Sequence, residues 1–73
     1  MTTLTEARSR TKTVGTLLTP RQVAERLGVQ LQTLADWRFR HRGPIFLKVG
    51  RLVRYPETQL EAWLAEQLHK SAA

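Results

Sequence analysis

The chain of 73 residues contains no cysteine, which excludes disulfides, cysteine-based zinc sites, iron–sulfur clusters and thiol nucleophiles. Its two histidines, His41 and His69, stand far apart in the sequence, so we expect neither a metal site nor a cofactor. Apolar runs such as Ile45–Leu47 are far shorter than the roughly 20 residues of a membrane-spanning helix. The N-terminus also lacks the apolar stretch of a secretory signal, so we expect a cytoplasmic protein without a membrane partner.

The chain is also too short and too poor in potential catalytic side chains for an active site. A domain of this length buries only about 60% of the surface that its unfolded chain exposes, which leaves one thin core and little volume for a cleft. Aspartate occurs once, at Asp36, and there is no cysteine to act as a nucleophile. We therefore expect a single small domain with no catalytic residue and no enzymatic activity.

Positive charge is abundant and unevenly distributed along the chain. Lys and Arg number twelve against six Asp and Glu, and the formal net charge of +6 favours a polyanionic partner. Between Asp36 and Tyr55, six basic residues outnumber one acidic residue, a net charge of +5. From Pro56 to the C-terminus, one basic residue stands against three acidic ones, a net charge of −2. This polarity indicates that the central segment binds the anionic partner.

A strong helix-start signal marks the beginning of the folded domain. Residues 1–16 are rich in Thr and basic residues and poor in apolar ones, so we expect them to form a disordered basic arm. Thr19 is suited to cap a helix, Pro20 to occupy its first position and Gln22 to complete a capping box. Gly28 then predicts the end of this helix after about two turns, because glycine readily adopts a left-handed conformation.

A second short helix is predicted from Leu31 to Phe39. Leu34 and Trp37 recur on one face of this segment and are expected to pack against the first helix. The small side chain of Ala24 lets the two helices approach, and the glycine turn joins them. The pattern favours a helix-turn-helix, although an ordinary helical hairpin fits it as well.

The segment from Ile45 to Tyr55 is rich in β-branched and aromatic residues around Gly50, which predicts a hairpin. A two-residue turn at Gly50 and Arg51 would mix apolar and charged side chains on both faces of the hairpin. We therefore expect a three-residue loop, residues 50–52, which separates the two kinds of side chain. This register places on the core face Leu47, Val49, Val53 and Tyr55, and on the opposite face Phe46, Lys48 and Arg54.

The last predicted helix begins at Pro56, a residue suited to a first helical position. Its apolar stripe consists of Leu60, Trp63, Leu64 and Leu68. Residues 71–73 are expected to fray, so the folded domain spans residues 17–70. The sequence thus predicts an α+β, mostly α-helical fold: a winged helix-turn-helix with a two-stranded wing and a C-terminal helix.

Several short motifs between Leu17 and Leu68 occur together in a known order. They are LTPRQVAERLGV (18–29), TL (33–34), Trp37, GP (43–44), KVGR (48–51), RY (54–55) and LEAWL (60–64). In this order the chain resembles the excisionase-type winged-helix DNA-binding domains, relatives of the DNA-binding part of MerR-type regulators. That family includes phage and plasmid excisionases, also called recombination directionality factors, and small AlpA-like activators. The resemblance implies that the second helix enters the major groove, the wing contacts the adjacent minor groove or backbone, and neighbouring copies bind cooperatively and bend the DNA.

The resemblance and the distribution of basic residues together predict which residues contact DNA. On the recognition helix they are Gln30, Gln32, Thr33, Asp36, Arg38 and Arg40. On the loop and wing they are Arg42, Lys48, Arg51 and Arg54, and at the start of the first helix Arg21. The residue types suit these roles, because Gln pairs bidentately with adenine and Arg with guanine or phosphate.

Some of these residues have structural alternatives. Asp36 can pair with Arg40 four residues later, which stabilises a helix by a few tenths of a kcal/mol. Arg38 can pack its aliphatic stem on the core instead of contacting phosphate. Phe46 can stack on DNA or pack beside the core. The basic residues of the loop and wing can also form a solvated face, although their clustering and the acidic last helix favour DNA contact. Trp37 and Trp63 are expected to be core residues.

The residues and the resemblance together predict a sequence-specific, cooperative DNA-binding and DNA-bending excisionase that directs an integrase towards excision of a prophage or related element. The expected partners are double-stranded DNA, an integrase and further copies of the chain, with no small-molecule effector. The expected location is the cytoplasm of a bacterial host. A small AlpA- or MerR-like transcriptional regulator is the alternative function. Outside DNA binding, the rival is an interaction module whose basic surface binds acidic protein segments.

Overall fold

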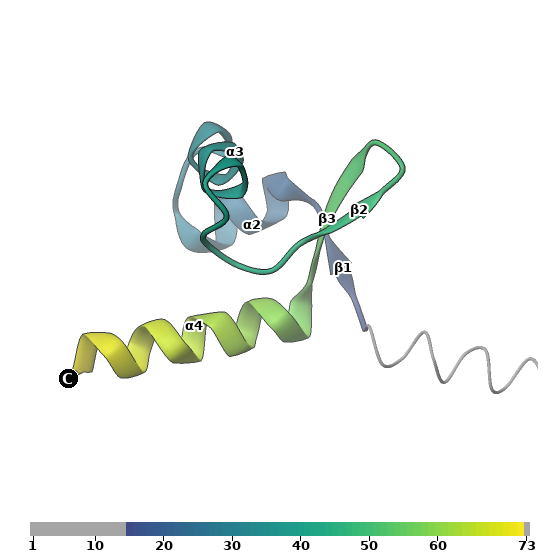
Figure 1. The fold of residues 1–73 in the computed structure, drawn as a ribbon. Coiled ribbons are helices and arrows are strands. Elements are labelled where there is room, and N and C mark those ends of the chain that lie inside the picture. Colours follow the sequence, from purple (N-terminus) through teal and green to yellow (C-terminus); the bar gives the residue numbers. More distant parts are fainter. Residues whose placement is uncertain (1–14, 73) are drawn as a thin grey trace, which may run out of the picture.

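Residues 15–72 are described by a computed structural model, in which they form three helices and a three-stranded antiparallel sheet (Figure 1). The elements in chain order are β1 (Leu17–Leu18), α2 (Pro20–Leu27), α3 (Leu31–Phe39), β2 (Leu47–Val49), β3 (Leu52–Pro56) and α4 (Glu57–Ala72). Helices α2 and α3, the β2–β3 hairpin and the C-terminal helix α4 form a winged helix-turn-helix, as the sequence predicts. All but the last two residues of the expected basic arm lie outside the described part of the chain.

Helix α2 has the ends that the sequence predicts. The backbone N–H of Gln22 donates to Thr19 Oγ1 over 3.1 Å, and the backbone N–H of Thr19 donates to Gln22 Oε1 over 2.8 Å. This reciprocal pair is a capping box, and it satisfies two backbone donors that a helix N-terminus otherwise leaves free. At the other end, Gly28 is left-handed, with φ of 71°, and its N–H donates to the carbonyl oxygen of Ala24.

Helix α3 ends in a left-handed turn at His41. The N–H of His41 donates to the carbonyl oxygen of Arg38 over 3.2 Å, and that of Arg42 donates to the carbonyl oxygen of Trp37 over 2.8 Å. This pair of bonds is the Schellman arrangement, which needs a left-handed residue directly after the C-cap. His41 supplies it with φ of 57°, a conformation that glycine adopts at lower cost.

The core lies where α2, α3, the sheet and the first half of α4 meet. Its buried apolar side chains are Leu18, Val23, Ala24, Leu34, Tyr55 and Leu60. Trp37 and Trp63 pack against this cluster with their ring centroids 5.9 Å apart, so the prediction that both belong to the core is confirmed. Aromatic rings at this separation attract each other in addition to burying apolar area.

The hairpin turn differs from the three-residue loop expected from the sequence. Val49 pairs with Leu52, so only Gly50 and Arg51 form the turn. Gly50 has φ of 65°, whereas Arg51 is not left-handed. A positive φ at the first of two turn residues is the type II′ arrangement, which matches the twist of the strands and takes Gly followed by almost any residue. This turn preference outweighs the cost of mixing apolar and charged side chains on one face.

The two-residue turn reverses the expected faces of β2. Leu47 and Val49 are 38% and 51% exposed, together with Leu52 at 54%, so the expectation that Leu47 and Val49 belong to the core is wrong. Phe46 instead packs against the core, with its ring centroid 6.1 Å from that of Tyr55. A shift of one residue in register exchanges the two faces of a strand.

Strand β1 is absent from the sequence-based prediction. Leu17 pairs with Pro56 and Leu18 with Tyr55, which makes β3 the central strand of the sheet. The N–H of Glu57 also donates to the carbonyl oxygen of Thr16 over 2.8 Å. A two-residue strand has no periodicity to detect, because it is defined by its partner rather than by its own sequence.

The two ends of α4 also differ from the prediction. Pro56 is the last residue of β3, and α4 begins one residue later, at Glu57. At its other end, the helix continues through Ala72. Leu68 is 72% exposed, so the stripe of α4 that packs on the core ends at Leu64. In Figure 1, α4 runs along the side of the domain opposite the tip of the hairpin.

Candidate nucleic-acid interface

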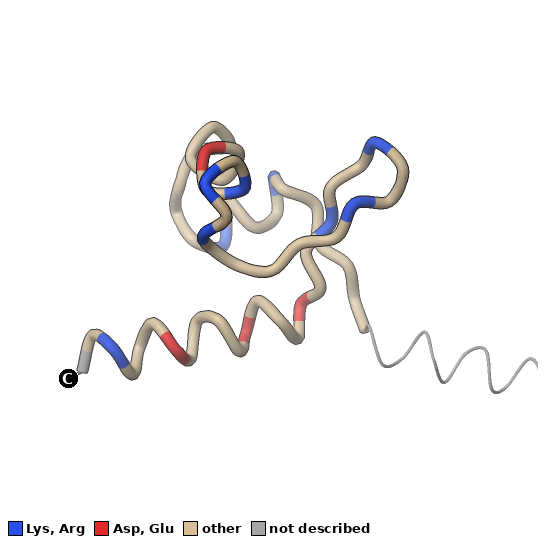
Figure 2. The backbone as a smooth tube through the Cα atoms, in the orientation of Figure 1, with Lys and Arg blue, Asp and Glu red and all other residues tan. Residues whose placement is uncertain are grey.

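Helix α3 and the tip of the β2–β3 hairpin project from the same side of the domain, away from α4 (Figure 1). Figure 2 shows Lys and Arg on α3 and on the hairpin, whereas most of the acidic residues lie on α4. The uneven charge of the sequence thus becomes a positive side and an acidic side of the folded molecule. A polyanion is attracted to the positive side. On α4, the carboxylates of Glu57 and Glu61 are paired with Arg26 over 3.0 and 3.2 Å.

The start of α3 presents amide side chains to solvent. Gln30 is the N-cap residue, but its side chain makes no capping hydrogen bond, and both Gln30 and Gln32 are exposed. Their donors and acceptors therefore remain available to a ligand. Thr33 is half-buried beside them. The fully buried Leu34 anchors this turn to the core and thereby fixes the orientation of the exposed face.

Asp36 and Arg40 form an ion pair on the outer surface of α3. Arg40 Nε donates to Asp36 Oδ1 over 3.1 Å, and the two side chains are 63% and 50% exposed respectively. The i,i+4 alternative for this pair is therefore confirmed. Such exposed pairs contribute about 0.3–0.5 kcal/mol, so a DNA phosphate or base can displace either partner at little cost.

Arg38 points towards the sheet rather than away from the domain. Its Nη1 donates to the hydroxyl oxygen of Tyr55 over 2.7 Å, and its guanidinium carbon lies 5.8 Å from the centroid of the Phe46 ring. The reason lies in helical spacing, because Arg38 follows the buried Leu34 by four residues and shares its side of α3. The structure thus connects Arg38 to the wing and does not group it with the exposed residues of α3.

The hairpin brings together three of the predicted cationic residues. Lys48 and Arg51 are exposed, with Arg51 in the turn itself. Arg54 is half-buried, and its Nη1 donates to the carbonyl oxygen of Val53 over 2.7 Å. Arg21 is exposed in the first turn of α2. No acidic side chain pairs with these four residues within the described part of the chain.

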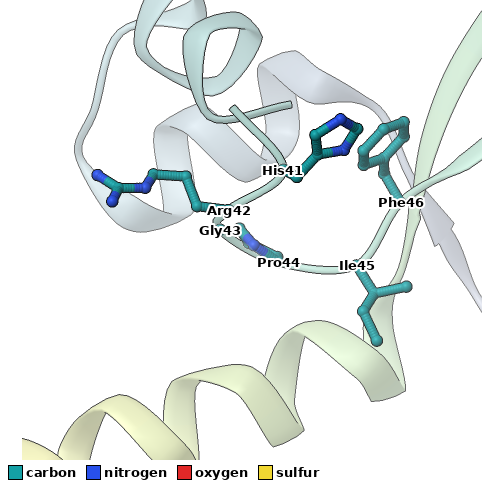
Figure 3. Close-up of a pocket in the computed structure, with 6 residues that line it drawn as sticks. All are labelled: His41, Arg42, Gly43, Pro44, Ile45 and Phe46. Atoms are coloured by element: carbon teal, nitrogen blue, oxygen red, sulfur yellow. The ribbon is translucent and has the colours of Figure 1, made fainter. Parts of the chain in front are cut away.

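Arg42 is separated from this group. It lines an open hollow of about 420 Å³ on the α4 side, together with Trp37, Gly43, Trp63, Gln67 and Lys70. Residues 41–46 form a second hollow of about 270 Å³, and Figure 3 shows the Arg42 side chain pointing away from Phe46. The structure therefore does not bring Arg42 together with the cations of the wing.

An exposed aromatic residue on α3 is missing from the sequence-based set. Phe39, in the last turn of α3, is 84% exposed. Helical spacing was the available signal, because Phe39 follows Gln32 by seven residues and shares its outer face. The sequence-based prediction treated Phe39 only as the end of a helix.

The sequence matches the family of helix-turn-helix domains over residues 17–68, which is 52 of its 73 residues. The chain belongs to the helix-turn-helix domain family. Neither the curated proteins nor the solved structures include a match to the chain.

The helix-turn-helix assignment supports DNA binding. A helix-turn-helix domain binds DNA, and its second helix, here α3, is the one that such motifs place in the major groove. Proteins of this domain family are typically not enzymes. Within residues 15–72, no helix is both long and apolar enough to cross a bilayer, and no cluster of side chains is suited to hold a metal ion.

Proposed function

We propose that this helix-turn-helix protein is an excisionase, which binds neighbouring DNA sites cooperatively, bends them and directs an integrase towards excision. The observation that carries the proposal is the placement of α3, with its exposed amide side chains, and of the cationic wing on one side of the domain (Figure 2). Two separate contacts of this kind favour a curved duplex, because bending brings the backbone to the wing while α3 occupies the groove. The domain family also includes AlpA- and excisionase-like proteins.

The proposed contacts fall into two classes. Gln30 and Gln32 at the start of α3 read base edges, since an amide side chain both donates to and accepts from a base. The cationic contacts to phosphate come from Arg21, Arg40, Lys48, Arg51 and Arg54. With about five phosphates neutralised, the logarithm of affinity should fall against the logarithm of salt concentration with a slope near −4.5.

Cooperativity follows from the size of the domain. Single DNA-binding modules bury roughly 600–1,000 Å² of protein surface, which limits the affinity of one copy. Occupation of adjacent sites raises the effective concentration of each copy for the next. We therefore expect weak binding to an isolated site and useful affinity on repeated sites.

The experiment is a gel-shift titration at two salt concentrations. The probes are the DNA upstream of the coding sequence and the nearest attachment-like repeats, each also prepared in circularly permuted form. We expect stepwise, cooperative shifts whose mobility depends on the position of the sites, which is the signature of a bend. Addition of the integrase encoded nearby should then increase excision of a substrate that carries both attachment sites.

Other outcomes separate the alternatives. One discrete shift at a promoter, without position-dependent mobility or an effect on excision, would identify a transcriptional regulator. The absence of any shift at low salt would contradict DNA binding and favour the protein-interaction module. The variant Lys70→Ala is the control, because Lys70 lies on α4 and should leave every DNA measurement unchanged.

A further inference from the structure

Three apolar side chains form an exposed strip along α3. Leu31, Ala35 and Phe39 follow one another at intervals of four residues, so they lie on one side of the helix. All three are exposed, Leu31 to 43% and Phe39 to 84%. The apolar contact of α3 with the core is made instead by Leu34, which is fully buried, and by Trp37. Helix α3 thus carries a second apolar surface that the fold does not use.

This strip lies beside hydrogen-bonding groups. Gln32 and Asp36 adjoin it on the same outer surface of α3. The floor of the major groove has the same mixture, because it presents hydrogen-bond donors and acceptors next to the C5 methyl groups of thymine. The strip spans the nine residues of α3, about 12 Å from Leu31 to Phe39 at the rise of an α-helix.

We propose that the strip Leu31–Ala35–Phe39 contacts thymine methyl groups and that Phe39 is a specificity-determining residue. The inference rests on the DNA binding of the proposed function and extends it to thymine at defined positions. Charge selects DNA over an apolar protein partner, since the segment from Asp36 to Tyr55 carries a net charge of +5 from six basic residues and one acidic residue. DNA is a polyanion whose major groove presents methyl groups, so it matches both the positive charge and the apolar strip.

The test compares thymine with uracil, which differs from thymine only by the absence of the C5 methyl group. Duplexes bound by the full chain are first selected from a random pool, and each thymine is then replaced singly by uracil. At a contacted position we expect wild-type affinity to fall about fourfold, the equivalent of one buried methyl group. Phe39→Ala should bind the thymine probe more weakly and should no longer distinguish it from the uracil probe.

Two further variants make the result specific. Phe39→Leu retains an apolar side chain and should keep part of the methyl dependence. Leu68→Ala removes a similarly exposed apolar side chain, 72% exposed on α4, and should keep all of it. Because Phe39 contributes little to the core, we expect the thermal unfolding of Phe39→Ala to match that of the wild type.

Either of two results would overturn the inference: equal wild-type affinity for thymine and uracil at every position, or an unchanged methyl dependence in Phe39→Ala. Weaker self-association of Phe39→Ala in sedimentation without DNA, together with an unchanged methyl dependence, would assign Phe39 to a contact between copies. The thymine–uracil comparison measures DNA affinity alone and does not require bending or excision. A protein that binds DNA but neither bends it nor promotes excision would refute the excisionase proposal and leave this inference intact.

Discussion

The guanidinium group of Arg38 donates a hydrogen bond to the hydroxyl of Tyr55 over 2.7 Å, which ties α3 to β3. The same guanidinium lies against the ring of Phe46, and that ring packs on Tyr55. The contact therefore joins α3, the proposed recognition helix, to β3, a strand of the wing. Under the proposed function, this contact holds the two DNA-binding elements together before DNA is bound, which would lower the entropic cost of binding.

Tyr55→Phe removes only the hydroxyl from this contact. Hydrogen bonds to charged groups contribute more than neutral ones, so the free energy of unfolding should fall by about 1.5 kcal/mol. Urea denaturation followed by tryptophan fluorescence measures this value. A loss below a few tenths of a kcal/mol would show that solvent replaces Tyr55 as the partner of Arg38.

The salt dependence of DNA binding should distinguish phosphate contacts from internal cations. Arg51→Ala should reduce the magnitude of the salt slope by about 0.9, the contribution of one phosphate contact. Arg38→Ala should weaken binding through a less well-oriented α3, yet leave the slope unchanged. Gel-shift titrations over a series of salt concentrations provide the slopes. If Arg38→Ala reduced the salt slope as much as Arg51→Ala, Arg38 would be shown to contact a phosphate group.

Substitutions of base-reading residues and of phosphate-contacting residues should have different effects on the DNA sequence preference. Gln32→Ala should change the preference among selected duplexes, because it removes an amide that is suited to a base edge. Arg54→Ala on the wing should weaken binding to all duplexes by a similar factor. Competition between a selected and a scrambled duplex measures both effects. Identical behaviour of the two variants would contradict the division of roles between α3 and the wing.

His41→Gly should stabilise the protein. His41 is left-handed, with φ of 57°, and exposed, so glycine removes the strain without removing a buried contact. After allowance for the greater freedom of glycine in the unfolded chain, we expect a gain of about 0.5–1 kcal/mol. Thermal and urea unfolding measure it. Gly28→Ala is the converse control, since it places a side chain at a left-handed position with free space and should destabilise the protein.

Gly43→Ala should be the most damaging of the glycine substitutions. A Cβ atom at this left-handed position would lie 2.7 Å from Cε3 and 3.1 Å from Cβ of Trp37. Overpacking and backbone strain together should cost about 2–4 kcal/mol. Gly50→Ala has the same kind of strain but open space, so its cost should be near 1 kcal/mol. Equal losses in urea unfolding would mean that Trp37 moves aside freely.

Local signals made the helix-turn-helix predictable from the sequence. The bounds of α3 were predicted correctly, and those of α2 followed from the capping residue Thr19 and from Gly28. Capping boxes and left-handed glycines involve hydrogen bonds between residues at most four or five positions apart. The local sequence therefore specifies these helix ends independently of the rest of the fold. The uneven charge is equally a property of the sequence, and by itself it indicates a polyanionic partner.

The wing was only partly predictable, because its details depend on pairing. The apolar pattern of residues 45–55 indicated a hairpin, but hydrophobic alternation favoured the wrong register. The type II′ preference of Gly50–Arg51 decided the register in the structure, at the cost of exposing Leu47 and Val49. Strand β1 exists only because β3 offers an edge to which two residues can bind.

The sequence by itself determined which side chains the domain can present to DNA and which segments become helices, because charge and capping are local properties. Tertiary structure alone decided how those side chains are used. It turned Arg38 inward to Tyr55 and directed Arg42 towards α4, and it left Phe39 exposed on α3. Each of these outcomes depends on which residues, distant in the chain, the fold brings next to the side chain or keeps away from it.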